Sequence, residues 1–90
     1  METSAVSLKI HGRVQGVYYR ASTKLKAQNL GLVGWVKNSM DGTVESHAEG
    51  SIKKLESFID WCHQGPPEAA VSLVESNWVL PKGYQEFSIK

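Results

Sequence analysis

The sequence predicts an α+β fold with the element order β-α-β-β-α-β and a short fifth strand. This is the ferredoxin-like, split βαβ arrangement, in which two helices cover one face of a mixed, largely antiparallel sheet. Three observations predict it: apolar and polar residues alternate in several short runs, two other runs have helical periodicity, and glycine and proline lie between the runs. The 90 residues suffice for one small domain, and we expect residues 1–90 to form it.

The first half of the pattern is strand, loop, helix and strand. Apolar residues alternate with polar ones over residues 6–10, and residues 12–16 interrupt this strand with a loop bounded by glycines. A helix begins at about Tyr19 and stops at Gly31. The residues that fall on one face of this helix are Tyr18, Ala21, Leu25 and Gln28. A second strand follows and ends near Asn38.

The second half is strand, helix, strand and short strand. Asp41-Gly42 predicts a hairpin turn, after which Val44, Ser46 and Ala48 fall on one strand face. Ser51 can cap the second helix, which residues 65–67 end. Its apolar stripe consists of Ile52, Leu55, Phe58, Ile59 and Cys62. In the fourth strand Val71 and Leu73 share one face, and Val74 and Trp78 share the other. A turn at residues 81–83 precedes a short edge strand with Phe87 and Ile89.

This order places two chain segments side by side. The first and second strands run parallel with the third between them, so their carboxyl ends lie at the same edge of the sheet. At about 4.8 Å for each strand step, the two ends are roughly 10 Å apart. An arginine side chain and a small ligand fit in that gap.

Composition and charge restrict the function classes. One cysteine, Cys62, excludes an intrachain disulfide. The N-terminal residues lack the pattern of a signal peptide, and no apolar run is long enough to span a bilayer, so we expect a cytoplasmic protein with no membrane association. Residues 1–40 carry six basic groups and one acidic group, whereas residues 41–90 carry four basic and eight acidic groups. The basic first half favours an anionic ligand.

The loop between the first strand and the first helix has the features of an anion site. Gly16 allows backbone torsions that turn successive N–H groups to one concave side, and the helix N-terminus adds unpaired N–H donors. Arg20 stands where the helix begins, so its guanidinium can close over the same anion. A tight turn beside a surface arginine is the alternative interpretation of these residues.

Two motifs resemble those of the acylphosphatase family. Residues 12–20, GRVQGVYYR, are similar to the family signature, with Tyr19 where the family usually has phenylalanine. Residues 34–38, GWVKN, are similar to its second motif. The residues that fit the family at its spacing outside these motifs are Thr23, Gly42, Val44, Gly50, Gly65, Pro66 and Pro67. The resemblance extends from about residue 7 to residue 90.

The resemblance implies hydrolysis of acyl phosphates to a carboxylate and phosphate. It implies that the Arg20 guanidinium and the backbone of residues 15–20 bind the phosphate. The residues of this loop are Gln15, Gly16, Val17, Tyr18, Tyr19 and Arg20. Asn38 would hold the attacking water, and we expect the Ser39 hydroxyl to orient the Asn38 amide. Because the leaving group is a carboxylate, no general acid is needed, and we expect no metal or cofactor. Inorganic phosphate should act as product and competitive inhibitor, and we expect a monomer.

Two other functions share this strand order. An RNA-binding module would need stacking aromatic residues on the third strand, and residues 43–49 offer none and contain two acids. A non-catalytic sensor of a small anion would keep the loop but show no turnover.

The cysteine and the three histidines are interpreted as structural. Cys62 lies on the apolar stripe of the second helix, and His11, His47 and His63 do not have the spacing of metal ligands.

Overall fold

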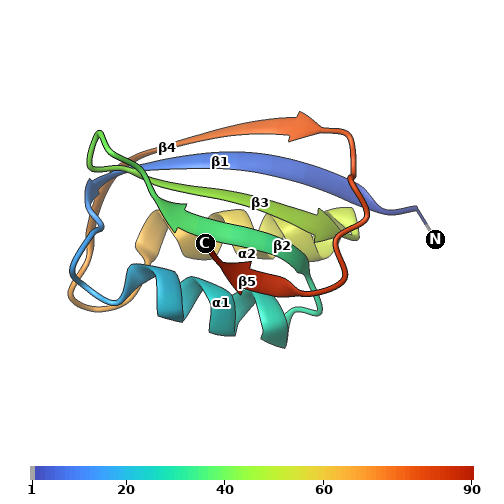
Figure 1. Cartoon of the computed structure of the whole chain (residues 1–90), viewed down its shortest axis with the longest axis horizontal. Helices are drawn as coiled ribbons and strands as arrows, with labels where there is room; N and C mark the ends of the chain where they lie inside the picture. The colour runs from blue at the N-terminus through green and yellow to red at the C-terminus, as the bar shows by residue number, and fades with distance from the viewer. Residues whose placement is uncertain (1) are drawn as a thin grey trace.

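A computed structural model describes residues 2–90 of the chain. Two helices and five strands follow one another in the expected order (Figure 1). The elements are β1 (Ser4–Arg13), α1 (Tyr19–Asn29), β2 (Val33–Asn38), β3 (Val44–Gly50), α2 (Ile52–Gln64), β4 (Ala70–Val79) and β5 (Phe87–Ile89). The α+β fold predicted from the sequence is confirmed.

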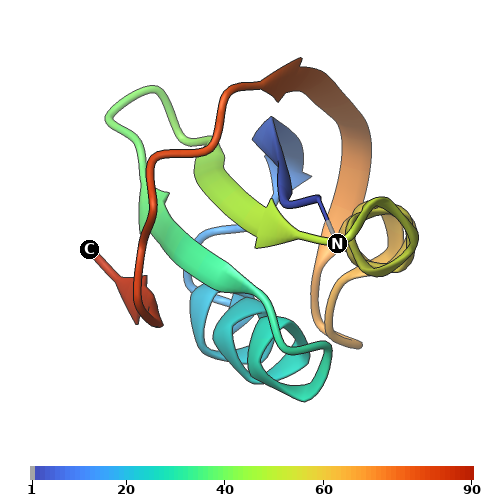
Figure 2. The ribbon, with the colours of Figure 1, turned by 90° about the vertical axis from the view of Figure 1, so that its right-hand side faces the viewer.

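The strands form one sheet in the order β4-β1-β3-β2-β5. β3 pairs antiparallel with both β1 and β2, so β1 and β2 run parallel with β3 between them, as the sequence predicts. β5 adds a short parallel edge beside β2. Both helices lie on the same side of the sheet, and the connection from β4 to β5 passes from one edge strand to the other (Figures 1 and 2).

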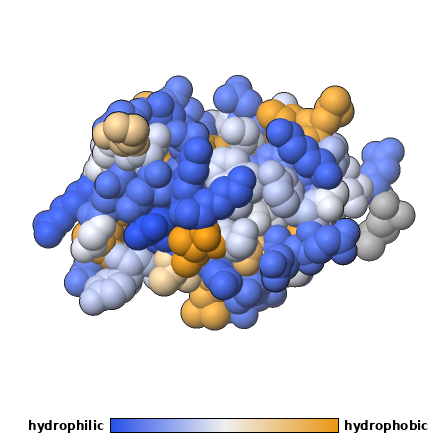
Figure 3. Space-filling model, viewed as in Figure 1, coloured by the Kyte–Doolittle hydropathy of each residue, from blue (hydrophilic) through white to orange (hydrophobic). Residues whose placement is uncertain are grey.

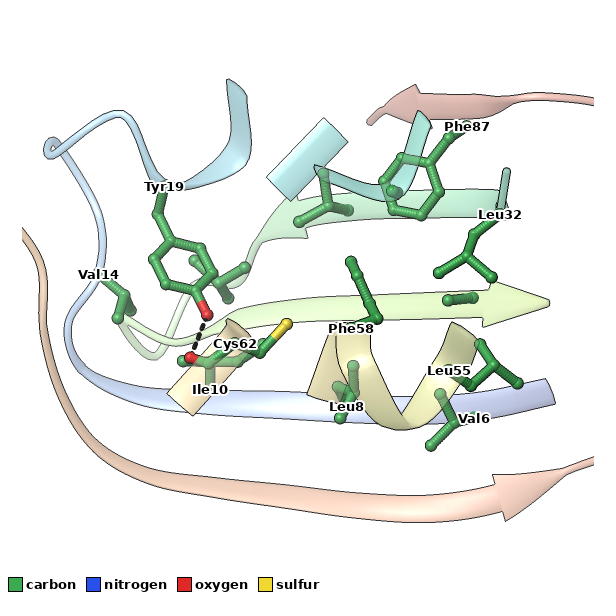
Figure 4. Close-up of a cluster of buried hydrophobic side chains, with 14 of the residues drawn as sticks. Val6, Leu8, Ile10, Val14, Tyr19, Leu32, Leu55, Phe58, Cys62 and Phe87 are labelled. Atoms are coloured by element: carbon green, nitrogen blue, oxygen red, sulfur yellow. Dashed lines mark hydrogen bonds between the residues drawn. The ribbon is translucent and has the colours of Figure 1, made fainter. Parts of the chain in front are cut away.

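The core lies between the sheet and the helices (Figure 4). The alternation in the central strands has the expected phase. The residues that β1 and β3 bury toward the helices are Val6, Leu8, Ile10, Val44, Ser46 and Ala48, each at most 2% exposed. Leu55, Phe58 and Cys62 of α2 are fully buried opposite these strands. The Phe58 ring meets the Phe87 ring of β5 edge-on, with 6.0 Å between the ring centroids.

The expected face of α1 is wrong. Tyr18, Ala21, Leu25 and Gln28 are exposed, and the helix instead buries Tyr19, Thr23 and Ala27. Hydrogen bonds explain how polar groups enter the core: the Thr23 hydroxyl donates to the Tyr19 carbonyl at 2.7 Å, and the Tyr19 hydroxyl donates to the Cys62 carbonyl at 2.6 Å. Burying such groups carries little penalty once they are hydrogen-bonded.

The ends of α2 and the exposure of its stripe follow from geometry. Ser51 caps the helix, since its hydroxyl accepts from the Lys54 backbone N–H at 3.4 Å. Ile52 is 54% exposed and Ile59 is half-buried, because at about 100° for each residue both lie at the margin of the stripe that Leu55, Phe58 and Cys62 define. In the edge strand β4, Leu73 and Trp78 are also more than half exposed.

A buried carboxylate fastens the connection between β4 and β5. Glu49 is 2% exposed, and its carboxylate accepts hydrogen bonds from the Lys82 and Gly83 backbone N–H groups and lies 2.7 Å from the His47 Nε2. Burial by itself raises the pKa of Glu49, but the hydrogen bonds from His47, Lys82 and Gly83 outweigh it and the pKa is lowered. The carboxylate therefore stays ionised and holds the segment that leads into β5.

Neither helix in the described part of the chain is long and apolar enough to cross a membrane.

Candidate functional site

A pocket of about 420 Å³ opens at the edge of the sheet where β1 and β2 end. Its walls come from the loop after β1, the first turn of α1, the end of β2 and the end of β5. The lining residues are Val14, Gly16, Tyr18, Tyr19, Arg20, Ala21, Asn38 and Ile89. The fold thus brings together Arg20 and Asn38, which are 18 positions apart in the sequence.

The backbone N–H groups in the loop after β1 have no hydrogen-bond partner among the described residues. Gly16 has φ 75°, and Tyr18, at the N-cap of α1, has φ 64° and ψ 21°. Tyr18 is the one non-glycine residue with positive φ among residues 2–90, a conformation that side chains with a Cβ adopt at a cost. No backbone N–H from residue 15 to residue 21 donates a hydrogen bond to another described residue. Successive unpaired N–H groups at a helix N-terminus form a site suited to an anion.

Arg20 adds the positive charge to this pocket. It is the second residue of α1, its side chain is half-buried, and it forms no salt bridge within residues 2–90. A guanidinium that has no carboxylate partner keeps all its donors for a ligand. The planar group can give two parallel hydrogen bonds to a phosphate or a carboxylate.

Asn38 is the last residue of β2 and carries an unpaired acceptor. Its Oδ1 is buried and has no hydrogen-bond partner among the described residues. Leaving a buried polar atom without a partner costs about 1–3 kcal/mol. Such an atom in a pocket wall is therefore suited to receive a hydrogen bond from a bound water or ligand.

The expected contact between Ser39 and Asn38 is wrong. The Ser39 hydroxyl donates to the Glu45 carboxylate at 2.6 Å instead. The β2–β3 hairpin pairs Lys37 with Glu45, which brings this carboxylate beside Ser39. A carboxylate is a stronger hydrogen-bond acceptor than an amide oxygen, so the Ser39 hydroxyl donates to Glu45 rather than to Asn38.

Three residues of the loop direct their side chains away from the pocket or under it. The Gln15 amide donates to the Ser39 carbonyl at 2.8 Å and to the Thr43 carbonyl at 2.9 Å, which ties the loop to the β2–β3 hairpin. Val17 is 3% exposed and belongs to the core. Tyr19 is 1% exposed and lies beneath the pocket, and burial raises the pKa of its hydroxyl, so the hydroxyl stays protonated. Gln15 and Val17 can reach a ligand only through their backbone.

Sequence reasoning missed three lining residues, Val14, Ala21 and Ile89. The first two flank residues that were identified, so their place could have been read from the loop and the first helical turn. Ile89 could not, because it reaches the pocket through the parallel pairing of β5 with β2, in which Val36 lies opposite Ile89. The short strand was expected from Phe87 and Ile89, but the sequence pattern does not specify which strand it pairs with.

The remaining reactive groups lie outside the pocket lining. Cys62 is fully buried, and burial raises the pKa of its thiol to about 12, so the nucleophilic thiolate does not form near neutral pH. Each histidine has a local partner: the Glu75 carboxylate for His11, the Glu49 carboxylate for His47 and the Ile59 carbonyl for His63. Among residues 2–90, no cluster of three His, Cys, Asp or Glu residues could hold a metal ion.

Comparisons with known proteins show which family and which fold the chain resembles. The family model described as Acylphosphatase matches residues 6–89. The chain is 46% identical over 89 residues to an acylphosphatase of Thermococcus kodakarensis, covering 99% of this chain and 98% of that protein. It is 55% identical over 81 residues to an acylphosphatase of Marinobacter nauticus, covering 90% of this chain and 86% of that one. The structure of an acylphosphatase from Coxiella burnetii superposes with a TM-score of 0.95 at 36% identity, covering 98% and 93% of the two chains.

Proposed function

The chain belongs to the acylphosphatase family and hydrolyses the carboxyl–phosphate bond of acyl phosphates, and we propose which of its residues do so. Arg20 and the backbone N–H groups of residues 15–20 bind the phosphoryl group. Asn38 holds the water that attacks it. The observation that carries this proposal is the coincidence, in one pocket, of unpaired backbone donors, an unpaired guanidinium and an unpaired amide oxygen.

The phosphoryl group is the part of the substrate that the loop and Arg20 match. It carries its negative charge on non-bridging oxygens, and each of these can accept an N–H donor. Phosphoryl transfer has a loose transition state in which charge is spread over these oxygens, so donors fixed around them stabilise it. The Gln15 side chain contributes indirectly, because its two hydrogen bonds hold the loop against the β2–β3 hairpin.

The Asn38 amide positions the attacking water. If the Asn38 amide turns its Oδ1 toward the pocket, a water that donates a hydrogen bond to this oxygen has a lone pair free for the phosphorus atom. An uncharged amide cannot accept the proton as a base, so we assign that role to a non-bridging oxygen of the bound phosphoryl group. The carboxylate leaves without protonation because carboxylic acids have a pKa near 4, and no acidic side chain is needed in the pocket.

Inorganic phosphate should bind where the phosphoryl group binds and compete with substrate. We further propose that residues 1–90 act as one monomeric unit. The cytoplasmic location expected from the sequence stays a prediction.

The experiment is hydrolysis of acetyl phosphate by the purified protein, with inorganic phosphate as the inhibitor. We expect turnover that persists after exhaustive chelation of divalent metals, and inhibition that raises KM and leaves kcat unchanged. Noncompetitive inhibition would place the phosphate site outside this pocket. Loss of all turnover on chelation, with recovery on adding a divalent ion, would contradict a mechanism built on Arg20 and Asn38 alone. Binding of single-stranded RNA, measured in parallel, should be absent.

A further inference from the structure

The pocket has an apolar side that binding of the phosphoryl group does not use. Three of its lining residues combine an apolar side chain with solvent exposure: Tyr18 is 73% exposed, Ala21 is exposed and Ile89 is 41% exposed. The other apolar lining residues, Val14 and Tyr19, are each 1% exposed, so they present almost no surface to a ligand. We call Tyr18, Ala21 and Ile89 the apolar wall.

The register of β5 places Ile89 on the same side of the sheet as Asn38. Ile89 lies opposite Val36, and paired residues of neighbouring strands project to the same face. Val36 is fully buried toward the helices, and Asn38, two residues further on, shares its face. Figure 3 shows an apolar patch on the surface in the region where β5 ends in Figure 1.

β5 holds Ile89 in this position firmly. The Lys90 backbone N–H donates to the Val36 carbonyl at 2.9 Å, directly after Ile89. Phe87, two residues before it, is 3% exposed and packs against Phe58. The buried Glu49 carboxylate fixes the chain that leads into the strand. A partly exposed isoleucine held this way offers a fixed apolar surface to whatever enters the pocket.

We propose that the apolar wall binds the acyl group of the substrate and that Ile89 determines specificity for straight acyl chains longer than acetyl. This inference rests on the proposed function, because it places the phosphoryl group at Gly16, Arg20 and Asn38. With the charged end of the substrate held there, the acyl chain extends toward the rest of the lining. An apolar chain that covers Ile89 removes apolar surface of both partners from water, which favours binding.

The size of the effect follows from burial of methylene groups. Full burial of one methylene strengthens binding about fourfold. Because Ile89 is 41% exposed in an open pocket, each methylene is only partly covered, and we expect roughly a twofold gain for each one. Short straight-chain carboxylic acids differ little in acidity, so the leaving group is equally good along the series and the gain reports binding to the wall.

The test is kcat/KM for acetyl, propionyl and butyryl phosphate, together with the inhibition constant of inorganic phosphate. In the unmodified protein kcat/KM should rise about twofold at each step, and a flat or falling series overturns the proposal without any variant. Ile89→Ala should lower the butyryl-to-acetyl ratio by about threefold. Its inhibition constant for phosphate should stay within about twofold of the unmodified value, because phosphate has no acyl chain.

Two further variants complete the test. Ser88→Ala is the matched control, since Ser88 neighbours Ile89 on the opposite face of β5 and pairs with Trp35; its ratio should equal that of the unmodified protein. Ile89→Thr keeps a β-branched strand residue and replaces the ethyl group on Cβ with a hydroxyl, so it serves if Ile89→Ala does not fold. An unchanged ratio in a folded Ile89 variant, or an equal drop in Ser88→Ala, would refute the role of Ile89. Failure of the proposed function is distinguishable from failure of the role of Ile89, because it would give noncompetitive inhibition by phosphate in the unmodified protein.

Discussion

Replacing Asn38 by alanine should separate chemistry from binding and from stability. The amide touches the attacking water in the proposed mechanism, and it has no hydrogen bond to the loop or to Arg20 among the described residues. Removing it therefore leaves the phosphate site in place. We expect kcat to fall by about a hundredfold or more, the usual effect of losing one preorganised polar group. The inhibition constant of phosphate should change by less than about threefold, since phosphate binds to other groups.

The same substitution should not destabilise the fold. The buried Asn38 Oδ1 has no partner, and such an atom costs about 1–3 kcal/mol when water does not reach it. Alanine removes this cost and loses some packing and strand propensity. We therefore expect a free energy of unfolding equal to that of the unmodified protein or higher by up to about 1 kcal/mol, a rise in Tm of at most about 8 °C for a domain of this size.

The assay combines acetyl phosphate kinetics, phosphate inhibition and thermal unfolding on the same preparations. Asn77→Ala is the matched control, because Asn77 is an exposed asparagine of β4 that pairs with Ser7 and does not line the pocket. It should leave kcat unchanged. If Asn38→Ala weakens phosphate binding while kcat at saturation is unchanged, Asn38 binds the phosphoryl group and the assignment of the water is wrong.

Three other substitutions test separate parts of the structure. Arg20→Lys keeps the charge but loses the planar pair of donors, so we expect both weaker phosphate inhibition and a kcat lower by about a hundredfold; near-normal kinetics would remove Arg20 from the site. Glu49→Gln should lower the free energy of unfolding by about 2 kcal/mol, because an amide cannot accept from His47, Lys82 and Gly83 as the carboxylate does. The lowered pKa of Glu49 means that its contribution to stability is complete above about pH 4.5, the pKa of an unperturbed glutamate, and is lost as pH falls toward the folded-state value. Urea unfolding between pH 3 and pH 7 should therefore show a shallower acid decline in Glu49→Gln, and equal slopes would refute the assignment. Cys62→Ala should cost about 1 kcal/mol of stability by leaving a small cavity while kcat stays unchanged; a large loss of turnover in the folded variant would make the thiol catalytic.

The strand pattern was readable because the core follows one simple rule. In β1 apolar side chains that face the helices alternate with polar ones, so Val6, Leu8 and Ile10 indicated both the strand and its buried face. The buried face of the first helix could not be predicted in the same way. Its buried face contains Tyr19 and Thr23, whose hydroxyls donate to backbone carbonyls, and a search for apolar residues at helical spacing does not detect a face buried in this way.

The same distinction separates the parts of the site that were predicted from those that were missed. Gly16, Arg20 and Asn38 could be placed together because the split βαβ order brings the ends of β1 and β2 to one edge. The position of Ile89 in the pocket depends on the parallel pairing of three residues of β5 with β2. The Ser39 hydroxyl donates to Glu45 across the hairpin and not to the adjacent Asn38. Both depend on partners that local patterns do not specify.

The distribution of unsatisfied polar groups argues that the pocket is built for a ligand. Two other polar side chains have several partners: the Glu49 carboxylate has three, and the Gln15 side-chain amide donates to two carbonyls. At the pocket, by contrast, the N–H groups of residues 15–21 and the Asn38 Oδ1 lack protein partners, and Tyr18 adopts a strained positive φ. A bound phosphoryl group and its attacking water would satisfy these groups together, so inorganic phosphate should raise the Tm of the protein.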